Sequence, residues 1–431
     1  MDNTLLWVLW GLGSLIGAYL LLQAFLYLGR GSPIERVRLL ENASLPGAGE
    51  EGFHRVVEAY VSTELRPNSR AEILFNGEEV YPRLFEDLRS ARDLIAWHVF
   101  WFKPGKLADQ LLEILCERAR AGVDVFFLYD HFGGWGVDDR YWEALREAGC
   151  EVNPFRPWRW NRLYKWQQRS HMRTVIIDGR VGYTGGFAIH DDWMGDGRHP
   201  GQWRDTSARI GGDLVRRLQT AFIIAWADAT GDLLLGDRLF PEETEVEGPH
   251  RAGLLFNAPS IGSTDAERYF ALSIRGAKQR LYITNAYVLP NGAFRHLLTE
   301  AVDRGVDVRV LTPGANTDQP STWYAARCHY QELLNAGVRI WEYEPTMVHA
   351  KTLVADGAWC SVGTINFDNR SISLNDEITL LAQGRDLGDR LQSRFLEDLE
   401  FARELDAETF RGRNIWERTK ERFWVLFSRI L

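Results

Sequence analysis

Cysteine is scarce in this sequence, and its placement excludes two common kinds of site. The four cysteines, Cys116, Cys150, Cys328 and Cys360, lie far apart and form no CxxC pair. A structural zinc site or a disulfide framework needs grouped cysteines, so neither is expected, and the pattern suits a reducing compartment. No cluster of His, Cys and Asp has metal-ligand spacing either. We therefore expect no metal and no cofactor.

An excess of positive charge is also missing. The formal net charge is −9, whereas proteins that bind nucleic acid usually carry a strongly basic surface. Nucleic acid is therefore not an expected partner, and any attraction to phosphate has to be local. The 431 residues, 45% of them hydrophobic, are enough for about two domains.

Charge is absent altogether from the 24 residues between Leu5 and Leu28, which are almost all apolar. About 20 such residues span a bilayer as a helix. A secretory signal peptide fits less well, because the run is too long, no Lys or Arg precedes it and no A-x-A site follows. Residues 1–45 are thus predicted to be a transmembrane anchor with a linker. Arg30, Arg36 and Arg38 follow the run, which places the remaining chain on the cytoplasmic side.

A phrase that occurs twice is the most informative feature present. Residues 171–178 read HMRTVIID and residues 349–356 read HAKTLVAD. Each copy has a histidine, a cation two residues later and an aspartate seven residues after the histidine. Two such sets indicate one active site assembled from two halves around a phosphate.

Other segments repeat at similar offsets. Buried strands are predicted at 93–102 and 280–289, and RAGVDVFFLYD (120–130) matches DRGVDVRVLTP (303–313). Strands alternate with helical patterns, which indicates an α/β fold with a mostly parallel or mixed sheet. We predict two tandem lobes, 46–240 and 241–405, with an acidic linker at 240–250.

The first half is longer just before its histidine. From Gly149 to His171 is 22 residues, but from Gly337 to His349 is only 12. The extra residues fall in a segment rich in tryptophan and arginine at 155–170. Tryptophan favours the membrane interface, and basic residues attract anionic headgroups. The candidate headgroup or membrane contacts are Trp158, Arg159, Trp160, Arg162, Lys165 and Trp166. The alternative is a solvated loop whose tryptophans cover a local core.

Residues 406–431 are predicted to form a basic amphipathic C-terminal helix. Trp416, Phe423 and Phe427 recur at helical spacing among basic residues. Such a helix can lie in a membrane interface, or it can pack on the protein's own core.

The two copies and their surroundings resemble the phospholipase D superfamily, whose hallmark is a doubled HKD motif. The phrase H-x-K-x4-D-x6-G-[ST]-x-N is matched fully from His349 to Asn366 and partly from His171. The lines YTGGFAIHDDW (183–193), QWRDTSARI (202–210) and SVGTINFDNRSISLNDE (361–377) are most similar to bacterial cardiolipin synthases. The resemblance implies two phospholipase D-type α-β-α lobes forming one pseudo-twofold unit.

The resemblance also implies a mechanism that residue chemistry supports. Phosphodiester exchange without a metal needs a nucleophile, a proton donor and cations around the phosphate oxygens. Two histidines can serve the first two roles if they begin in opposite protonation states. The candidate catalytic set is His171, His349, Arg173, Lys351, Asp178 and Asp356, and the candidate phosphate-binding set is Arg173, Lys351, Asn366 and Thr364. Asp178 and Asp356 are interpreted as structural partners near the site.

Each histidine needs a carboxylate to orient it, and the resemblance puts that group about 30 residues downstream. Asp205 lies 34 residues after His171, and Glu377 lies 28 after His349. An anionic partner fixes the tautomer and stabilises the imidazolium. This spacing predicts that each carboxylate serves the histidine of its own half.

The first copy departs from the pattern at two positions. Arg173 replaces lysine, and Ala188 stands where the second copy has Asn366. A guanidinium is a planar fork and binds phosphate differently from an ammonium. Either the pocket is active and asymmetric, which we favour, or the first half has lost activity.

The resulting hypothesis is a membrane-anchored phosphatidyltransferase that makes cardiolipin from two phosphatidylglycerols and releases glycerol. Its partners would be anionic phospholipids and the bilayer, in a bacterial-type inner membrane. A phospholipase D or general transphosphatidylase, which uses water or another alcohol, and a weakened lipid-binding homologue are the alternatives. A nuclease of the same superfamily is disfavoured by the net charge of −9.

Overall fold

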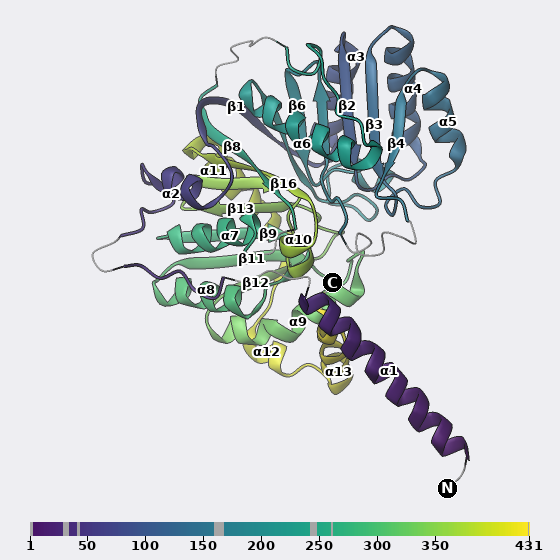
Figure 1. The fold of residues 1–431 in the computed structure, drawn as a ribbon. Helices are drawn as coiled ribbons and strands as arrows, with labels where there is room; N and C mark the ends of the chain where they lie inside the picture. The colour runs from purple at the N-terminus through teal and green to yellow at the C-terminus, as the bar shows by residue number, and fades with distance from the viewer. Residues whose placement is uncertain are drawn as a thin grey trace.

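The computed structural model describes residues 3–28, 34–40, 44–158, 168–241, 248–259, 262–429 and 431. Helix α1 (Asn3–Leu28) extends from the body of the molecule, and α2 (Phe53–Tyr60) precedes the sheet (Figure 1). Part of the acidic linker, residues 242–247, lies outside these ranges.

The described residues of the first half contribute seven strands and four longer helices to the body. In chain order they are β1 (Arg66–Phe75), α3 (Asn76–Ser90), β2 (Leu94–Val99), α4 (Lys106–Arg120), β3 (Asp124–Asp130), α5 (Asp139–Glu147), β4 (Glu151–Phe155), β5 (Thr174–Ile177), β6 (Val181–Gly185), the 3-10 turn η2 (Asp191–Trp193), β7 (Thr206–Gly211) and α6 (Asp213–Thr230).

The second half repeats this plan with short additions. Its elements are β8 (His250–Asn257), α7 (Asp265–Gly276), β9 (Arg280–Asn285), β10 (Val288–Leu289), α8 (Gly292–Asp303), β11 (Asp307–Pro313), α9 (Pro320–Asn335), β12 (Arg339–Tyr343), β13 (Lys351–Ala355), β14 (Trp359–Gly363), β15 (Phe367–Asp368), α10 (Asn369–Ser373), β16 (Glu377–Gln383), α11 (Arg385–Leu399), β17 (Ala402–Glu404), α12 (Ala407–Arg411), α13 (Ile415–Trp424) and η3 (Val425–Phe427).

The described residues form one sheet of 15 strands in the order β17-β12-β11-β9-β13-β14-β16-β8-β1-β7-β6-β5-β2-β3-β4. The antiparallel pair β1–β8 is its centre, and the strand order repeats outward on both sides of it. The β2–β3–β4 and β9–β11–β12 groups are parallel, and most other pairs are antiparallel. The chain therefore has a mixed α/β fold. The lobe boundaries predicted from sequence remain a proposal, because the sheet runs continuously through them.

Local sequence explains why helix and strand alternate at matching places. Gly122 and Gly305 end the turns after α4 and α8 with φ of +91° and +86°, a region that glycine enters without steric cost. The buried strands β3 and β11 follow directly. Helix α7 starts at a capping box in which Thr264 and Glu267 exchange hydrogen bonds.

Among the described residues, three apolar clusters pack against the sheet. One lies under α6 and α11 and includes residues from both halves, such as Ile210, Trp226 and Leu380. A second lies among α3, α4 and α5, and a third among α2, α7, α8 and α9. Burial on both faces accounts for the nearly continuous apolar runs of β2 and β9.

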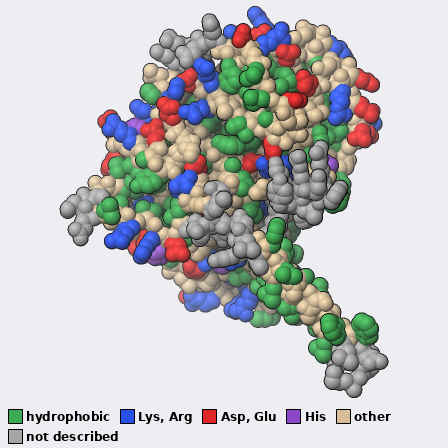
Figure 2. Space-filling view, viewed as in Figure 1, with side chains coloured by type: hydrophobic (Ala, Val, Ile, Leu, Met, Phe, Trp, Pro, Cys, Tyr) green, Lys and Arg blue, Asp and Glu red, His purple; other side chains and the backbone are tan. Residues whose placement is uncertain are grey.

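Apolar side chains of α1 remain exposed, as Figure 2 shows along this helix. Among the described residues, no helix meets the length and hydropathy needed to cross a membrane. The transmembrane anchor therefore stays a prediction.

Both readings of the C-terminal segment find some support in its contacts. Glu421 of α13 is buried and pairs with Arg413 at 2.9 Å, and Trp424 packs on the core. Trp416 and Phe423 are 75% and 52% exposed. Tyr19 of α1 donates a hydrogen bond to the carbonyl of Leu426, so this segment also contacts the first helix.

Candidate active site

The two motif histidines lie just before the matching strands β5 and β13, where the halves of the chain meet. The N–H of His171 donates to the carbonyl of Asp376 at 2.9 Å, and the N–H of His349 donates to that of Arg204 at 2.7 Å. Each histidine backbone is therefore held by a segment of the opposite half. Both side chains are buried.

The orienting carboxylates are crossed between the halves. Nδ1 of His171 lies 3.0 Å from Glu377 Oε2, and Nδ1 of His349 lies 3.0 Å from Asp205 Oδ2. The in-half pairing predicted from sequence is wrong. The β-bridges Ser170–Asp376 and Arg204–Val348 carry each acid to the histidine of the other half.

Hydrogen bonding assigns the tautomer of both rings. Nδ1 of His171 faces two acceptors, Glu377 and the carbonyl of Thr364 at 3.0 Å, so this nitrogen carries the proton. In this tautomer Nε2 carries the lone pair of the ring. In His349, Asp205 receives the Nδ1 proton and Nε2 accepts from Lys351 Nζ at 2.8 Å.

The two carboxylates have opposite electrostatic settings. Burial raises the pKa of Glu377 to about 7, against the hydrogen bond from Thr364 and the charge of Arg173. Burial also raises the pKa of Asp205. The hydrogen bonds from His349 and Trp193 and the charge of Lys351 outweigh this effect and bring the pKa below its ordinary value. Asp205 is therefore ionised at neutral pH, while Glu377 titrates there.

The motif cations are buried beside the histidines. Lys351 Nζ also donates to the carbonyl of His349 at 2.5 Å, and Arg173 donates to the carbonyl of His171 at 2.9 Å. Burial lowers the pKa of Lys351 to about 7, with Asp205 opposing and Arg173 reinforcing the shift. Burial, together with the charges of these cations, holds the pKa of both histidines well below the ordinary value. Both imidazoles are thus neutral at neutral pH and lie beside the two motif cations.

Thr364 is engaged in a different contact from the predicted one. Its hydroxyl donates to Glu377 at 2.5 Å and accepts from the N–H of Ile378 at 2.9 Å. The hydroxyl is therefore occupied by Glu377 and Ile378, and its predicted phosphate-binding role stays a prediction. In the first half, Gly186 takes this place because a Cβ there would lie 2.1 Å from Asp205.

Asn366 keeps a free polar atom in the described part of the site. Its Nδ2 donates to Ser371 at 3.2 Å, while Oδ1 is buried without a partner there. The amide still has a second N–H for a phosphate oxygen. Ala188 at the matching position is fully buried and has no polar side-chain atom.

Asp178 and Asp356 lie at the far ends of β5 and β13 from the histidines. Asp178 accepts from the N–H groups of Arg92, Asp93 and Leu94, and Asp356 accepts from three N–H groups before and at the start of β9. Both sit in the left-handed region, with φ of +52° and +55°. These contacts fit the structural interpretation, and their place in the catalytic set is wrong.

The aromatic and basic segment is only partly described. Trp158 is 62% exposed, and the other five candidate contacts, Arg159, Trp160, Arg162, Lys165 and Trp166, lie outside the described residues. Two arginines at its ends are tied to the protein: Arg156 pairs with Asp376 at 2.7 Å and Arg169 with Asp130 at 2.6 Å. The segment is therefore anchored one residue from Glu377.

Aromatic rings around the histidines were missed by the sequence reasoning. Phe100 meets the ring of His171 edge-on at 5.0 Å, and Trp193 meets that of His349 at 5.1 Å. Trp193 also donates to Asp205 at 2.7 Å. In the sequence, the only indication of a role for Trp193 was its place at the end of the line YTGGFAIHDDW.

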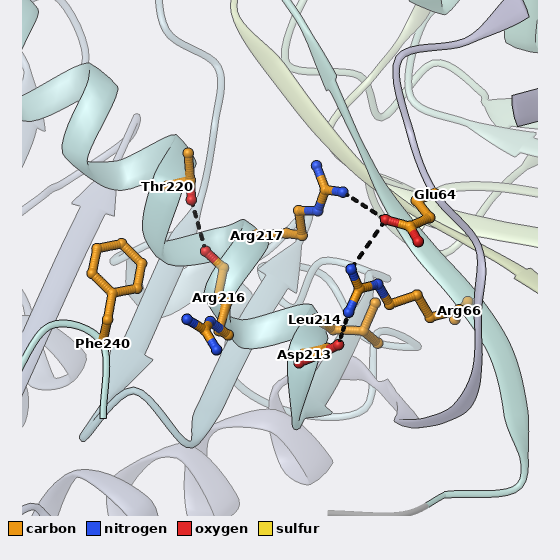
Figure 3. Close-up of a pocket in the computed structure, with 9 residues that line it drawn as sticks. Glu64, Arg66, Asp213, Leu214, Arg216, Arg217, Thr220 and Phe240 are labelled. Atoms are coloured by element: carbon orange, nitrogen blue, oxygen red, sulfur yellow. Dashed lines mark hydrogen bonds and ion pairs between the residues drawn. The ribbon is translucent and has the colours of Figure 1, made fainter. Parts of the chain in front are cut away.

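A separate pocket of about 420 Å³ lies between α6 and β1, away from the histidines (Figure 3). Arg66 pairs with Glu64 and Asp213, and Arg217 pairs with Glu64. These pairs are solvent-exposed and largely compensate one another, so the pocket offers little net attraction for an anion.

Replacing Glu377 with glutamine is expected to change how stability depends on pH. Because the folded pKa of about 7 lies above the ordinary 4.5, the folded state keeps a proton that the unfolded state releases between these values. The free energy of unfolding should thus fall as pH rises from 4.5 to 7, by at most about 1.4 kcal/mol per pH unit. Glu377→Gln removes this contribution. Denaturant unfolding from pH 4.5 to 7.5 measures it, with exposed Glu113→Gln as control; parallel wild-type and Glu377→Gln curves would contradict it.

Comparisons with known proteins show which family this chain is similar to. A family model described as cardiolipin synthase, PLD-like domain, matches residues 272–399. A cardiolipin synthase of Geobacillus kaustophilus is 36% identical over 84% of this chain and 72% of its own length. A probable cardiolipin synthase of Bacillus subtilis is 32% identical over 85% and 73%, and cardiolipin synthase 2 of Bacillus anthracis is 31% identical over 100% and 87%.

Solved structures support the fold alone. The phosphatidylserine synthase of Haemophilus influenzae superposes with a TM-score of 0.64 at 13% identity, covering 88% of this chain and all of that one. A polyphosphate kinase of Porphyromonas gingivalis gives a TM-score of 0.52 at 11% identity, covering 86% of this chain and 53% of that one.

Proposed function

The chain belongs to the cardiolipin synthase family of phospholipase D-like enzymes, and from this premise we propose that it joins two phosphatidylglycerols into cardiolipin and releases glycerol. The observation that carries the proposal is the pair of buried histidines, each with a carboxylate of the opposite half and a cation two residues away. Two such sets provide attack and proton transfer on opposite sides of one phosphorus.

His171 is the proposed nucleophile. Glu377 and the carbonyl of Thr364 hold its Nδ1 proton, so the lone pair of Nε2 is available for attack on phosphorus. A P–N bond forms and the bond to the glycerol oxygen breaks. Ionisation of Glu377, whose pKa is about 7, stabilises the positive ring of the phosphohistidine.

His349 is the proposed acid and base. Its Nε2 shares a proton with Lys351, whose pKa of about 7 lets the proton move at neutral pH. Ionised Asp205 stabilises the imidazolium that delivers this proton to the departing glycerol oxygen. The same nitrogen then removes the proton from the hydroxyl of the second phosphatidylglycerol, which attacks phosphorus and breaks the P–N bond.

Arg173, Lys351 and the amide of Asn366 are the proposed phosphate contacts. The guanidinium also lies 5.7 Å from the ring centroid of Phe100, which fixes its plane. The asymmetric pocket therefore offers the phosphate the planar guanidinium of Arg173 on one side, and the ammonium of Lys351 with the amide of Asn366 on the other.

Arg173→Lys is expected to lower the rate of cardiolipin formation about tenfold, because a lysine loses the bidentate fork and the contact with Phe100. The rate on phosphatidylglycerol vesicles measures this, with exposed Arg180→Lys as the matched control. A faster Arg173→Lys enzyme would instead mean that the first half is impaired by its arginine.

We further propose that the bilayer holds the enzyme through α1 and the C-terminal segment. The supporting observations are the exposed apolar side chains of α1, the exposed Trp416 and Phe423, and the 5.9 Å contact between the rings of Tyr19 and Phe427. With α1 spanning the bacterial-type inner membrane, the catalytic part lies on the cytoplasmic side, because arginines follow the apolar run.

A lipid-product assay on the purified full chain tests the proposed reaction. Phosphatidylglycerol vesicles should yield cardiolipin and glycerol in equal amounts. Phosphatidic acid as the main product would identify a hydrolase instead, and the absence of any product would favour the lipid-binding alternative.

A further inference from the structure

A hydroxyl and a carboxylate form an unassigned pair at the edge of the candidate active site. The Tyr287 hydroxyl donates to Asp318, with both carboxylate oxygens 2.8 Å away. Tyr287 follows β9, and Asp318 lies in the loop between β11 and α9. No step of the proposed reaction uses either group.

Strand pairing places this pair beside the phosphate contacts. Lys351 lies opposite Asn285 in the β9–β13 pair, and β10 runs parallel to β15 with Val288 opposite Phe367. Tyr287 directly precedes Val288, and Asn366 directly precedes Phe367. Tyr287 and Asn366 are therefore neighbours across this pair of strands. The Asn285 amide oxygen accepts from the N–H groups of both Tyr287 and Phe367, which locks the two segments together.

Electrostatics gives an independent indication of the same position. Desolvation raises the pKa of Asp318, while the hydrogen bond from Tyr287 and the charges of Lys351 and Arg173 oppose this shift. Asp318 nevertheless keeps one side open to solvent. It is therefore an accessible carboxyl within the field of the cations that hold the phosphate.

The matching position of the first half has different chemistry. Phe102 pairs with Ile189 as Val288 pairs with Phe367, so Trp101 corresponds to Tyr287. Lys103 Nζ lies 4.8 Å from the ring centroid of Trp101 and donates to the carbonyl of Trp135. One side of the site is thus aromatic and basic, while the side next to Lys351 and His349 carries a hydroxyl and a carboxylate.

A carboxylate beside a phosphate site repels anions, so it suits a ligand group that donates hydrogen bonds. The alcohol that leaves and the alcohol that enters both react at His349, the histidine of the same half. We propose that Tyr287 and Asp318 bind the second, non-reacting hydroxyl of that alcohol, and so select a polyol over water or a simple alcohol. This inference rests on the proposed function and names the acceptor that its site prefers.

The step itself adds no new reactant. The reacting hydroxyl of the bound polyol loses its proton to His349, its oxygen forms the P–O bond, and the P–N bond to His171 breaks. The second hydroxyl donates to Asp318 and accepts from Tyr287, which holds the reacting oxygen in line with phosphorus.

Competition between two alcohols tests the selection. The purified full chain acts on phosphatidylglycerol vesicles in the presence of equal concentrations of labelled glycerol and 1-propanol. The ratio of labelled phosphatidylglycerol to phosphatidylpropanol reports the alcohol site, because both products come from the same phosphoenzyme. Asp318→Asn and the milder Tyr287→Phe are compared with wild type, and Asp303→Asn, an exposed carboxylate on α8, is the matched control.

Wild type and Asp303→Asn should favour glycerol, and this preference should fall about tenfold in Asp318→Asn and in Tyr287→Phe. An unchanged ratio in both variants overturns the inference while leaving the proposed function intact. A wild type that forms neither of these products nor cardiolipin from phosphatidylglycerol overturns the proposed function itself, whereas cardiolipin without either product overturns only the inference. Ethanolamine in place of 1-propanol adds one further outcome: a wild-type preference for it over glycerol would show that the carboxylate binds an ammonium group, and would also overturn the inference.

Discussion

Replacing His171 with alanine is expected to lower cardiolipin formation by about four orders of magnitude or more, because the proposed nucleophile of the P–N bond is lost. His349→Ala is expected to be of similar severity with phosphatidylglycerol, since both proton transfers are lost. His296→Ala, an exposed histidine on α8, should leave the rate unchanged. Rates of lipid-product formation measure all three.

The two histidines are then separated by a donor that needs no proton for its leaving group. A phosphatidyl ester of p-nitrophenol releases nitrophenolate directly, so His349→Ala should regain a burst of about one nitrophenolate per enzyme and accumulate phosphohistidine. His171→Ala should give no burst. The opposite pattern would make His349 the nucleophile.

Replacing the carboxylates by amides should reveal that they act across the halves. Asp205→Asn and Glu377→Gln are each expected to slow cardiolipin formation by about two to four orders of magnitude, as the loss of an orienting acid does in other histidine-dependent enzymes. Their side-chain sizes are kept, so packing changes little. Asp232→Asn, an exposed acid after α6, is the matched control.

The nitrophenyl donor identifies which histidine each acid serves. The structure pairs Asp205 with His349, so Asp205→Asn should regain the burst, as His349→Ala does. It pairs Glu377 with His171, so Glu377→Gln should not. A burst from Glu377→Gln and none from Asp205→Asn would instead match carboxylates that serve their own halves.

Much of this fold can be read from local patterns. The helices α4 and α8 are each followed by a glycine in a left-handed turn before the next repeated strand, and Gly122 and Gly305 have φ of +91° and +86°. Alternation of buried strands with amphipathic helices predicts an α/β sheet, and the sheet is mixed as expected. These local patterns predict the fold correctly because each depends on residues that are close together in the chain.

The roles of some residues within the site could not be predicted from local sequence patterns. Thr364 has the residue type that binds phosphate, but its single proton is donated to Glu377. Asp178 and Asp356 complete the repeated phrase, yet they hold backbone N–H groups at the far ends of their strands. A motif records which residues occur together, whereas a role depends on the partner that each atom meets.

The sequence by itself determined the kind of chemistry: one histidine, one cation and one acid in each of two copies, with the first copy altered. Only the tertiary structure decided which carboxylate pairs with which histidine. Glu377 lies 206 residues from His171, and Asp205 lies 144 from His349. No spacing rule predicts contacts between residues so far apart in the sequence. These contacts form only when β1 and β8 join the two halves of the sheet. The bridges Ser170–Asp376 and Arg204–Val348 then bring each carboxylate to the histidine of the other half.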